Sequence, residues 1–386
     1  RPGERLERGL YKADAAEVLG REEDVAVQER LVKAAHGVPG EFPPGALAEA
    51  AALPEVPGKA DFAGRKDLRR LPLVTIDGAK ARDFDDAVCV QKEGRGYRLW
   101  VAIADVAHYV RPGSHLDQEA RERGNSYYFP SSVEPMFPEK LSNGLCSLNP
   151  DVPRLCMVAE LLFGPDGQVR GEDFYAAVMQ SHARLTYAQV HRALEGNDPA
   201  EQKALAAHLP MLRQAEALAR VLNRMRSGRG SLDFDLPEPE IRFNYMGEAV
   251  DISPRPRTFA HQIIEEFMIA ANEAVARLLT DRGLPCVYRV HEDPDPDKLA
   301  AAMQLLSRSS LGPSLPKPRA GGLAPKDLQN VLATAQGTDM EYLAGRLLLR
   351  TMMQAKYATR HQGHFGLASE CYCHFTSPIR RYADLL

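Results

Sequence analysis

The chain has 386 residues, 44% of them hydrophobic, a composition typical of a globular protein with one large domain or two to three ordinary ones. Charged residues interrupt every long apolar run, which argues against a membrane-spanning helix and a signal peptide. The net charge is -4, from 48 basic and 52 acidic residues, which argues against a generally basic surface that coats nucleic acid but not against a narrow basic channel. Six scattered cysteines lack the spacing of a disulfide scaffold, so we expect reduced thiols and a cytoplasmic protein.

The first 70 residues are predicted to lie outside the main domain. Residues 1–40 contain mixed-charge segments that favour helices up to about residue 36, and the proline- and glycine-rich stretch GVPGEFPPG that follows marks a break. We interpret them as an N-terminal helical segment and a remnant of a separate module. Residues 41–70 form a lead-in that includes the short helical stretch ALAEAAAL. Because the chain begins with Arg1 rather than Met, we also expect it to be a fragment.

The main domain is predicted to span residues 71–386. Three short runs from residue 71 onward are rich in β-branched and aromatic residues and predict strands, namely LPLVTI, AVCVQ and YRLWVAIADV. Later in the chain, residues 259–280 and 341–358 carry apolar residues at helical spacing. Strands that precede long helices, without a regular alternation of the two, predict an α+β fold with mixed, mainly antiparallel sheets packed by long helices.

Four aspartates are crowded into the segment TIDGAKARDFDDAV, on a predicted loop between two strands: Asp77, Asp83, Asp85 and Asp86. At an effective dielectric constant near 20, two carboxylates about 4 Å apart repel each other by roughly 4 kcal/mol before screening. A bound divalent cation offsets such repulsion, and so does a solvated turn that spreads the side chains into water. Magnesium suits the first alternative because it takes a few carboxylates and leaves other positions to water and phosphate, whereas the spacing does not match an EF-hand.

The C-terminal segment HFTSPIRRYADLL is predicted to begin a helix near Pro378, after Ser377. On a helix the adjacent Arg380 and Arg381 point about 100° apart, so only one of them can face a given site. An arginine aimed at a transferring phosphate stabilises the charge that develops there and is the expected partner of an acidic metal site. The alternative is a surface helix with ordinary arginines.

Two further groups of residues have ordinary explanations as well as functional ones. The histidines and cysteines between His361 and His374 lack the paired spacing of a structural zinc site, so buried thiols and ordinary histidines are favoured. Aromatic residues in NSYYFP, LTYAQV and SLDFDLPEPE are typical of a core, but such rings also stack on the bases of single-stranded nucleic acid. Taken singly, these residues do not decide a function.

Six segments, in this order, resemble the signature motifs of the RNB domain of the ribonuclease II and ribonuclease R family: TIDGAKARDFDDAV, IADVAHYV, LSNGLCSLNP, YRVHEDP, HFGLASECY and HFTSPIRRYADL. The resemblance extends from about residue 65 to the last residue. It implies a processive exoribonuclease that degrades single-stranded RNA from its 3′ end to nucleoside 5′-monophosphates with Mg²⁺, or with Mn²⁺ as the alternative ion. The domain is then expected to pack around an RNA channel and to act as a monomer, with no membrane and no obligate protein partner.

The resemblance also implies roles for individual residues. The family's four acidic catalytic positions, which bind magnesium and organise the attacking water, correspond to Asp77, Asp83, Asp85 and Asp86. Arg380 matches the arginine that contacts the scissile phosphate. The resemblance implies that the rings of Tyr128 and Phe234 clamp the 3′-terminal bases. It also implies that Tyr187 and Glu265 contact the ribose 2′-hydroxyl.

This sequence departs from the family pattern at both ends. The family's last motif normally continues and an OB-fold follows it, so we expect the C-terminal end of the catalytic domain to be incomplete. OB-folds usually precede the domain as well, so we interpret residues 1–40 as the remnant of an accessory RNA-binding module. Two other functions are alternatives: an RNA-binding protein with an inactive RNB domain, against which the intact aspartates argue, and a DNA-directed metal nuclease, against which Tyr187 and Glu265 argue.

Overall fold

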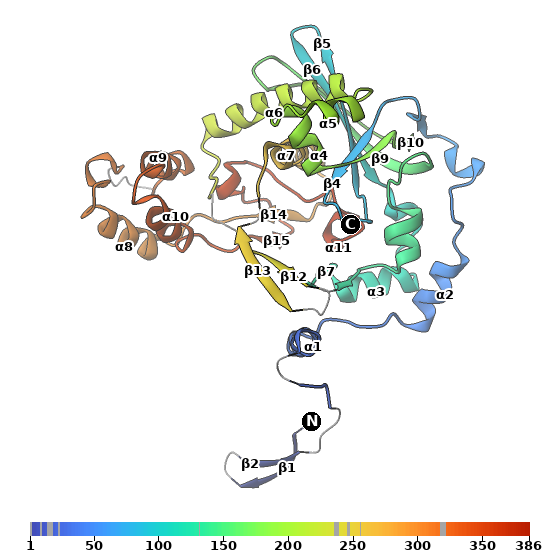
Figure 1. Ribbon diagram of the computed structural model, residues 1–386, viewed down its shortest axis with the longest axis horizontal. Helices are drawn as coiled ribbons and strands as arrows, with labels where there is room; N and C mark the ends of the chain where they lie inside the picture. The colour runs from blue at the N-terminus through green and yellow to red at the C-terminus, as the bar shows by residue number, and fades with distance from the viewer. Residues whose placement is uncertain are drawn as a thin grey trace. The chain divides into compact units, whose positions relative to one another are not determined.

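The computed structural model describes residues 2–7, 10–13, 18–21, 24–130, 132–234, 239–244, 248–254, 256–316 and 322–386. The chain divides into two compact units (Figure 1). Unit 1 consists of Arg1–Glu41, Ser126–Glu134 and Glu238–Arg255, and unit 2 contains the rest of the chain. No helix within the described ranges has the length and apolar character needed to cross a membrane.

Unit 1 is built from one helix and three two-stranded antiparallel sheets. Its elements are β1 (Pro2–Glu7), β2 (Leu10–Ala13), α1 (Val25–Ala35), β7 (Tyr127–Tyr128), β8 (Val133–Glu134), β12 (Pro239–Phe243) and β13 (Ala249–Pro254). Lys33 of α1 joins the helix to the second segment of the unit, because its Nζ lies 2.8 Å from the Glu134 carboxylate and 4.7 Å from the centre of the Phe129 ring. The prediction of a helical segment over residues 1–40 is correct for α1 but wrong for β1 and β2, which pair with each other as antiparallel strands.

Unit 2 contains a seven-stranded sheet with the strand order β11-β4-β5-β6-β9-β10-β3. The strands are β3 (Lys66–Asp67), β4 (Val74–Asp77), β5 (Asp86–Glu93), β6 (Gly96–Ala104), β9 (Pro153–Phe163), β10 (Val169–Gln180) and β11 (Ala183–Thr186). The inner pairs are antiparallel, whereas β11 pairs with β4 and β3 pairs with β10 in parallel. This mixed, mainly antiparallel sheet confirms the predicted α+β class.

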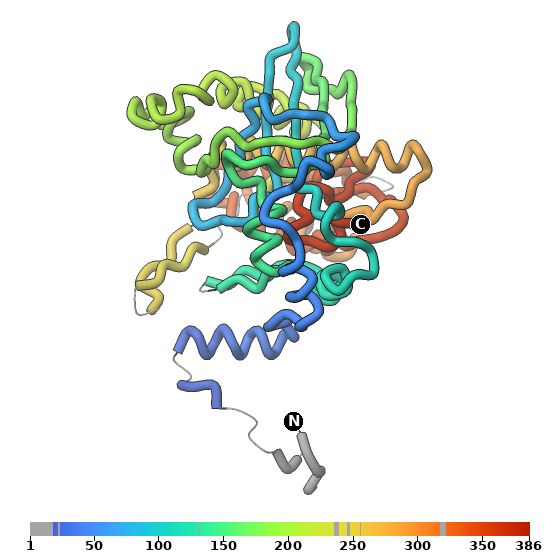
Figure 2. The backbone as a smooth tube through the Cα atoms, turned by 90° about the vertical axis from the view of Figure 1, so that its right-hand side faces the viewer, coloured from blue at the N-terminus to red at the C-terminus, as the bar shows by residue number. Residues whose placement is uncertain are grey.

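Long helices pack against this sheet. The helices that follow β11 are α4 (Tyr187–Leu194), α5 (Pro199–Ala204), α6 (Leu209–Arg229) and α7 (Phe259–Asp281). The views agree that α6, in yellow-green, lies beside the β5–β6 hairpin, in cyan (Figure 2), and α7 contacts β6 and β9. Phe267 of α7 and Leu99 of β6 are fully buried in the shared core, so the predicted helix over residues 259–280 is confirmed together with its apolar face.

The remaining elements of unit 2 form smaller groups. They are α2 (Pro44–Ala52), α3 (His115–Arg123), α8 (Pro296–Leu306), α9 (Pro325–Ala335), α10 (Glu341–Leu349), α11 (Tyr382–Leu385), β14 (Tyr288–Val290), β15 (Lys356–Ala358), a π-helix (Lys140–Leu145) and the 3₁₀ helices Lys59–Phe62, Val106–His108, Gly312–Ser314 and Phe365–Leu367. Helices α8, α9 and α10 share a second apolar core. The predicted helix over 341–358 is too long, because Thr351 closes the last turn of α10 by donating its N–H and its hydroxyl to Leu348 O, and β15 follows and pairs with β14.

Candidate active site

The aspartate segment forms the connection between two neighbouring strands, as predicted. Strand β4 ends at Asp77 and β5 begins at Asp86, so Asp83 and Asp85 lie on the loop between them. Asp85 is buried, with 4% of its surface exposed, and the other three side chains are half-buried. The negative charges of Asp83 and Asp86 act on both Asp77 and Asp85, so the structure brings the four predicted carboxylates together.

Ser147 fixes the backbone of this loop. Its hydroxyl accepts a hydrogen bond from the N–H of Phe84 at 3.0 Å and donates one to the carbonyl of Arg82 at 2.7 Å. The next residue, Leu148, donates its N–H to the carbonyl of Phe84 at 2.9 Å. The segment LSNGLCSLNP therefore holds the aspartate loop in place, a role that could not be assigned from its residue types.

The C-terminal segment supplies polar groups to Asp85, although the two lie 294 residues apart in the sequence. The N–H of Ile379 donates to Asp85 Oδ1 at 2.8 Å, and Arg380 Nε lies 3.5 Å from Asp85 Oδ2. Oδ2 is buried and has no hydrogen-bond partner among the described residues. Arg380 also donates from Nη2 to the Ser377 hydroxyl at 3.1 Å, while 48% of its side chain stays exposed.

The predicted helix at Pro378 is wrong, because residues 378–380 form turns and α11 begins only at Tyr382. Asp384 explains the difference: its carboxylate accepts the Ser377 N–H at 2.8 Å and pairs with Arg381 at 2.7 Å. Arg381 is thereby held by α11, and Arg380 faces Asp85. The expectation that only one of the two arginines faces the site is confirmed, although turns rather than a helix separate them.

A second arginine, Arg184 of β11, was not predicted. Its Nη2 donates to the carbonyls of Gly78 and Ala79 at 2.9 and 2.7 Å, and its guanidinium carbon lies 5.6 Å from the centre of the Phe84 ring. Arg184 reaches the loop because β11 runs parallel to β4. Its partners lie more than 100 residues earlier in the sequence, so no local spacing could have indicated this contact.

Burial and mutual repulsion dominate the electrostatics of the aspartates. Burial raises the pKa of Asp77, and the charges of Asp86 and Asp83 raise it further, against the opposing effect of Arg184 and Arg380. Burial also raises the pKa of Asp85 well above its ordinary value, although Arg380 and the Ile379 N–H oppose the shift. The pKa of Asp86 is raised by burial and lowered in part by Arg380. The nearby arginines therefore do not offset the cost of keeping these carboxylates ionised.

The carboxylates are close enough to repel one another but do not form a ready-made cage. Within the described parts of the chain, no group of three or more His, Cys, Asp or Glu side chains is arranged to hold a metal ion. The histidine and cysteine group near the C-terminus makes other contacts: Cys373 Sγ lies 3.6 Å from Asn272 O, and His374 Nδ1 lies 2.8 Å from the Tyr357 hydroxyl.

Tyr187 lies beside the end of β4 through the topology of the sheet, and Glu265 is related to it through α7. Thr186, the residue before Tyr187, pairs with Asp77 across the β11–β4 ladder, so Tyr187 starts α4 beside the end of β4. The Tyr187 ring stacks on His261 with 4.1 Å between ring centres. His261 precedes Glu265 by four residues on α7, so the two lie on the same side of that helix.

The two predicted clamp residues lie in different units. Phe234 lines a cavity of about 720 Å³ in unit 2, together with Glu265, Arg257 and Tyr342. The structure therefore brings Phe234 and Glu265 to one cavity. Tyr128 lies on β7 of unit 1, with 54% of its surface exposed. Its predicted pairing with Phe234 stays a prediction.

The chain matches a protein-family model and several curated relatives. The RNB domain model matches residues 65–386. Ribonuclease R of Vibrio cholerae and that of Escherichia coli strain K12 are both 47% identical to this chain, over 375 and 376 residues; each match covers 96% of this chain and 45% of the relative. The chain thus spans about half the length of the curated relatives it matches.

A solved structure extends the similarity to three dimensions. Ribonuclease R of Mycoplasma genitalium, in complex with ribose-methylated single-stranded RNA, matches with a TM-score of 0.87 and 32% identity, covering 96% of this chain and 57% of that one. The motif order, the fold and these matches agree. The chain therefore belongs to the RNB domain family.

Proposed function

We propose that this chain carries the catalytic domain of a processive 3′-to-5′ exoribonuclease, which hydrolyses single-stranded RNA to nucleoside 5′-monophosphates. The observation that carries the proposal is the aspartate loop, where buried Asp85 keeps Oδ2 without a hydrogen bond beside Arg380. The similarity to proteins named ribonuclease R, and to one solved with single-stranded RNA, supports the assignment.

The donor set fits a divalent cation such as Mg²⁺, with Mn²⁺ as the alternative. Carboxylate oxygens are the ligands that Mg²⁺ prefers, and burial raises the pKa values of Asp77, Asp85 and Asp86 by more than the neighbouring arginines lower them. These three residues and Asp83 would hold the metal. When bound, such an ion lowers the pKa of a coordinated water and stabilises the leaving oxygen of the phosphodiester.

The chain's own residues orient and stabilise the reacting phosphate. Asp85 sets the position of Arg380 by accepting the Ile379 N–H and by pairing with Arg380 Nε. The exposed half of the Arg380 side chain can contact the scissile phosphate, where its fixed charge stabilises the negative charge that develops on the equatorial oxygens. Arg184 keeps the loop carbonyls in place from the opposite strand.

Binding of the strand is assigned to residues outside the aspartate loop. Rings of Tyr128 and Phe234 stack on terminal bases, which requires no base sequence and suits a processive enzyme. Tyr187 and Glu265 contact the 2′-hydroxyl, the group by which a protein tells RNA from DNA. Residues 71–386 form the catalytic domain around the RNA channel, and residues 1–40, which belong to the separate unit 1 with Tyr128, contribute to RNA binding.

The protein is further proposed to act in the cytoplasm as a monomer without an obligate protein partner. The six scattered cysteines lack the spacing of a disulfide scaffold, which supports a reducing compartment. Sedimentation of the purified protein tests the monomer directly.

The test uses a 5′-labelled single-stranded RNA and a matched DNA strand, each with Mg²⁺ and with a chelator. We expect a short labelled end product from RNA with Mg²⁺, full-length RNA with chelator, and intact DNA in both. A matched pair of variants locates the activity: Arg380→Gln is expected to lose it, and Arg170→Gln, at an exposed ion pair with Asp166, is expected to keep it. Full-length RNA under both conditions would contradict the proposal.

A further inference from the structure

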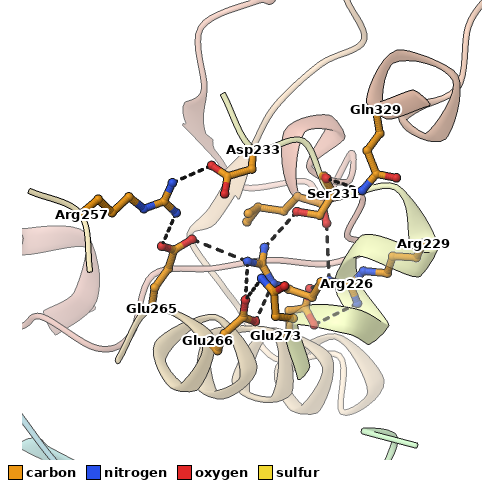
Figure 3. A network of polar contacts seen from close by, with 11 residues as sticks. Arg226, Arg229, Ser231, Asp233, Arg257, Glu265, Glu266, Glu273 and Gln329 are labelled. Atoms are coloured by element: carbon orange, nitrogen blue, oxygen red, sulfur yellow. Dashed lines mark hydrogen bonds and ion pairs between the residues drawn. The ribbon is translucent and has the colours of Figure 1, made fainter. Parts of the chain in front are cut away.

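Glu265 is held from two sides by arginines (Figure 3). It lies in the wall of the cavity that Phe234 also lines. Arg257 donates from Nη2 to Glu265 Oε2 at 2.8 Å, and Arg226 Nη2 lies 3.6 Å from Glu265 Oε1. Even so, 38% of the Glu265 side chain remains exposed. The carboxylate is therefore fixed in orientation yet open to a ligand, and each of its oxygens has a further lone pair with which to accept a hydrogen bond.

The same guanidinium also binds the loop that carries Phe234. Arg257 donates from Nη1 to Asp233 Oδ1 at 2.7 Å, and Asp233 is the neighbour of Phe234 in the chain. Arg257 stands just before α7, whose N-cap is Thr258. Arg257 thus joins Asp233, the neighbour of the proposed base-stacking residue Phe234, to Glu265, which is proposed to contact the ribose.

The layer behind this contact is buried and fully paired. Arg226 donates from Nε and Nη2 to the Glu266 carboxylate at 2.7 and 2.8 Å and from Nη1 to the Ser231 hydroxyl at 2.9 Å. Only 1% of the Glu266 side chain is exposed. Gln329 of α9 donates to the carbonyl of Ser231 at 3.1 Å. Because these charge-assisted bonds lock α6 to α7 and to residue 231, the exposed Arg257 bridge is the part of the network that a ligand meets.

We propose that Arg257 is a positioning residue that sets the spacing between Phe234 and Glu265 and thereby makes the site select ribose over deoxyribose. This inference rests on the proposed function, since it assigns a task to the same site. Without Arg257, Glu265 loses the donor on Oε2 and the loop loses its tie to α7. The carboxylate then samples orientations that do not meet a 2′-hydroxyl, while the aspartate loop and Arg380 are unchanged.

The test compares wild type with Arg257→Gln, Glu265→Gln and the double variant on matched RNA and DNA strands of one sequence. For Arg257→Gln we expect KM for RNA to rise about tenfold, the size of one lost charge-assisted contact, with kcat within about twofold of wild type. The preference for RNA over DNA is expected to fall in Arg257→Gln. The double variant is expected to prefer RNA as much as Glu265→Gln alone does, because Arg257 acts on this preference through Glu265.

Two further variants separate positioning from general damage to the fold. Arg257→Lys keeps one donor and is expected to recover part of the RNA preference, whereas Asp233→Asn removes only the loop contact and is expected to raise KM with the preference kept. Arg170→Gln serves as the matched control. An active wild type with an unchanged RNA preference in Arg257→Gln, or additive losses of that preference in the double variant, would overturn this inference alone. A wild type that leaves RNA intact would instead overturn the proposed function.

Discussion

Two carboxylate-rich regions of unit 2 are built on opposite electrostatic principles. In the α6–α7 network each glutamate pairs with an arginine: Glu265 and Glu266 with Arg226, and Glu273 with Arg229 (Figure 3). In the aspartate loop, burial raises the pKa values of Asp77, Asp85 and Asp86, and neighbouring carboxylates raise those of Asp77 and Asp85 further. The first region carries its own counter-charges, and the second is the one proposed to bind a cation from solution.

The contrast shows how to distinguish structural from functional carboxylates in a fold. A buried carboxylate with a bidentate arginine has its lone pairs satisfied and stabilises the packing of two helices. A buried carboxylate with an orphaned oxygen, such as Asp85 Oδ2, costs folding free energy in the absence of a ligand.

The largest effect is expected from Asp85→Asn. The variant removes a metal-binding charge and the partner of Arg380, so RNA cleavage with Mg²⁺ should fall on the order of a thousandfold. Binding of single-stranded RNA, followed by fluorescence anisotropy, should stay near the wild-type value. Asp166→Asn, which replaces an exposed carboxylate on the β9–β10 turn, should leave both RNA cleavage and RNA binding unchanged. Cleavage by Asp85→Asn at the wild-type rate would contradict a catalytic role for the aspartate loop.

The second-largest effect is expected on the stability of the α6–α7 network. Glu266→Gln leaves Arg226 buried without its bidentate carboxylate, so we expect the free energy of unfolding to fall by about 3–5 kcal/mol. Urea unfolding followed by circular dichroism measures this loss. Glu216→Gln, at an exposed pair with Arg220 on the same helix, should change it by less than about 1 kcal/mol. Equal losses in both variants would contradict the assigned difference between buried and exposed pairs.

The third effect is a stabilisation that depends on pH. The pKa of Asp77 is raised to about 8 in the folded chain, so its protonated form stabilises the fold at acidic pH. That contribution is fully present below about pH 4 and is lost as the pH rises to about 8. Asp77→Asn stays neutral, so with chelator at pH 8 we expect it to be more stable than wild type by about 1–3 kcal/mol, with the difference shrinking towards pH 4. Urea unfolding at both pH values checks this, and a wild type that is the more stable form in chelator at pH 8 would contradict it.

The smallest effect is expected at the cavity that Phe234 lines. Phe234→Ala removes a stacking surface worth about 1–3 kcal/mol per base, so the Kd for single-stranded RNA should rise about tenfold. Anisotropy titrations with strands of different base sequence should show the same loss for each, because stacking does not read sequence. A loss confined to one sequence would indicate a base-specific contact instead.

Local patterns predicted those features whose causes are local. The aspartate loop followed from two β-branched runs flanking a polar segment, and α7 followed from apolar spacing over 259–280. Three predictions of helix failed where side-chain contacts or strand pairing decided the structure. They lie at residues 2–7 and 10–13, beyond Thr351, and at Pro378, where the Asp384 carboxylate binds Ser377 and Arg381.

Contacts across the fold were outside the reach of sequence spacing. Ser147 and Arg184 hold the aspartate loop from segments about 65 and 105 residues away. Arg257 lies close to Glu265 in the sequence, but its second partner, Asp233, is 24 residues away and reaches it only because α6 and α7 pack together. The motifs identified the reactive groups, and the sheet and helix packing supplied the residues that position them.

The most direct test of the aspartate loop as a cation site is calorimetric titration of Mg²⁺ into the wild-type protein and into Asp86→Asn, with Asp166→Asn as the control. If the repulsion among these carboxylates is offset by a divalent ion, the affinity of Asp86→Asn should fall at least about tenfold while that of Asp166→Asn is unchanged. An affinity of Asp86→Asn equal to that of wild type would contradict the assignment of the aspartate loop as the metal site.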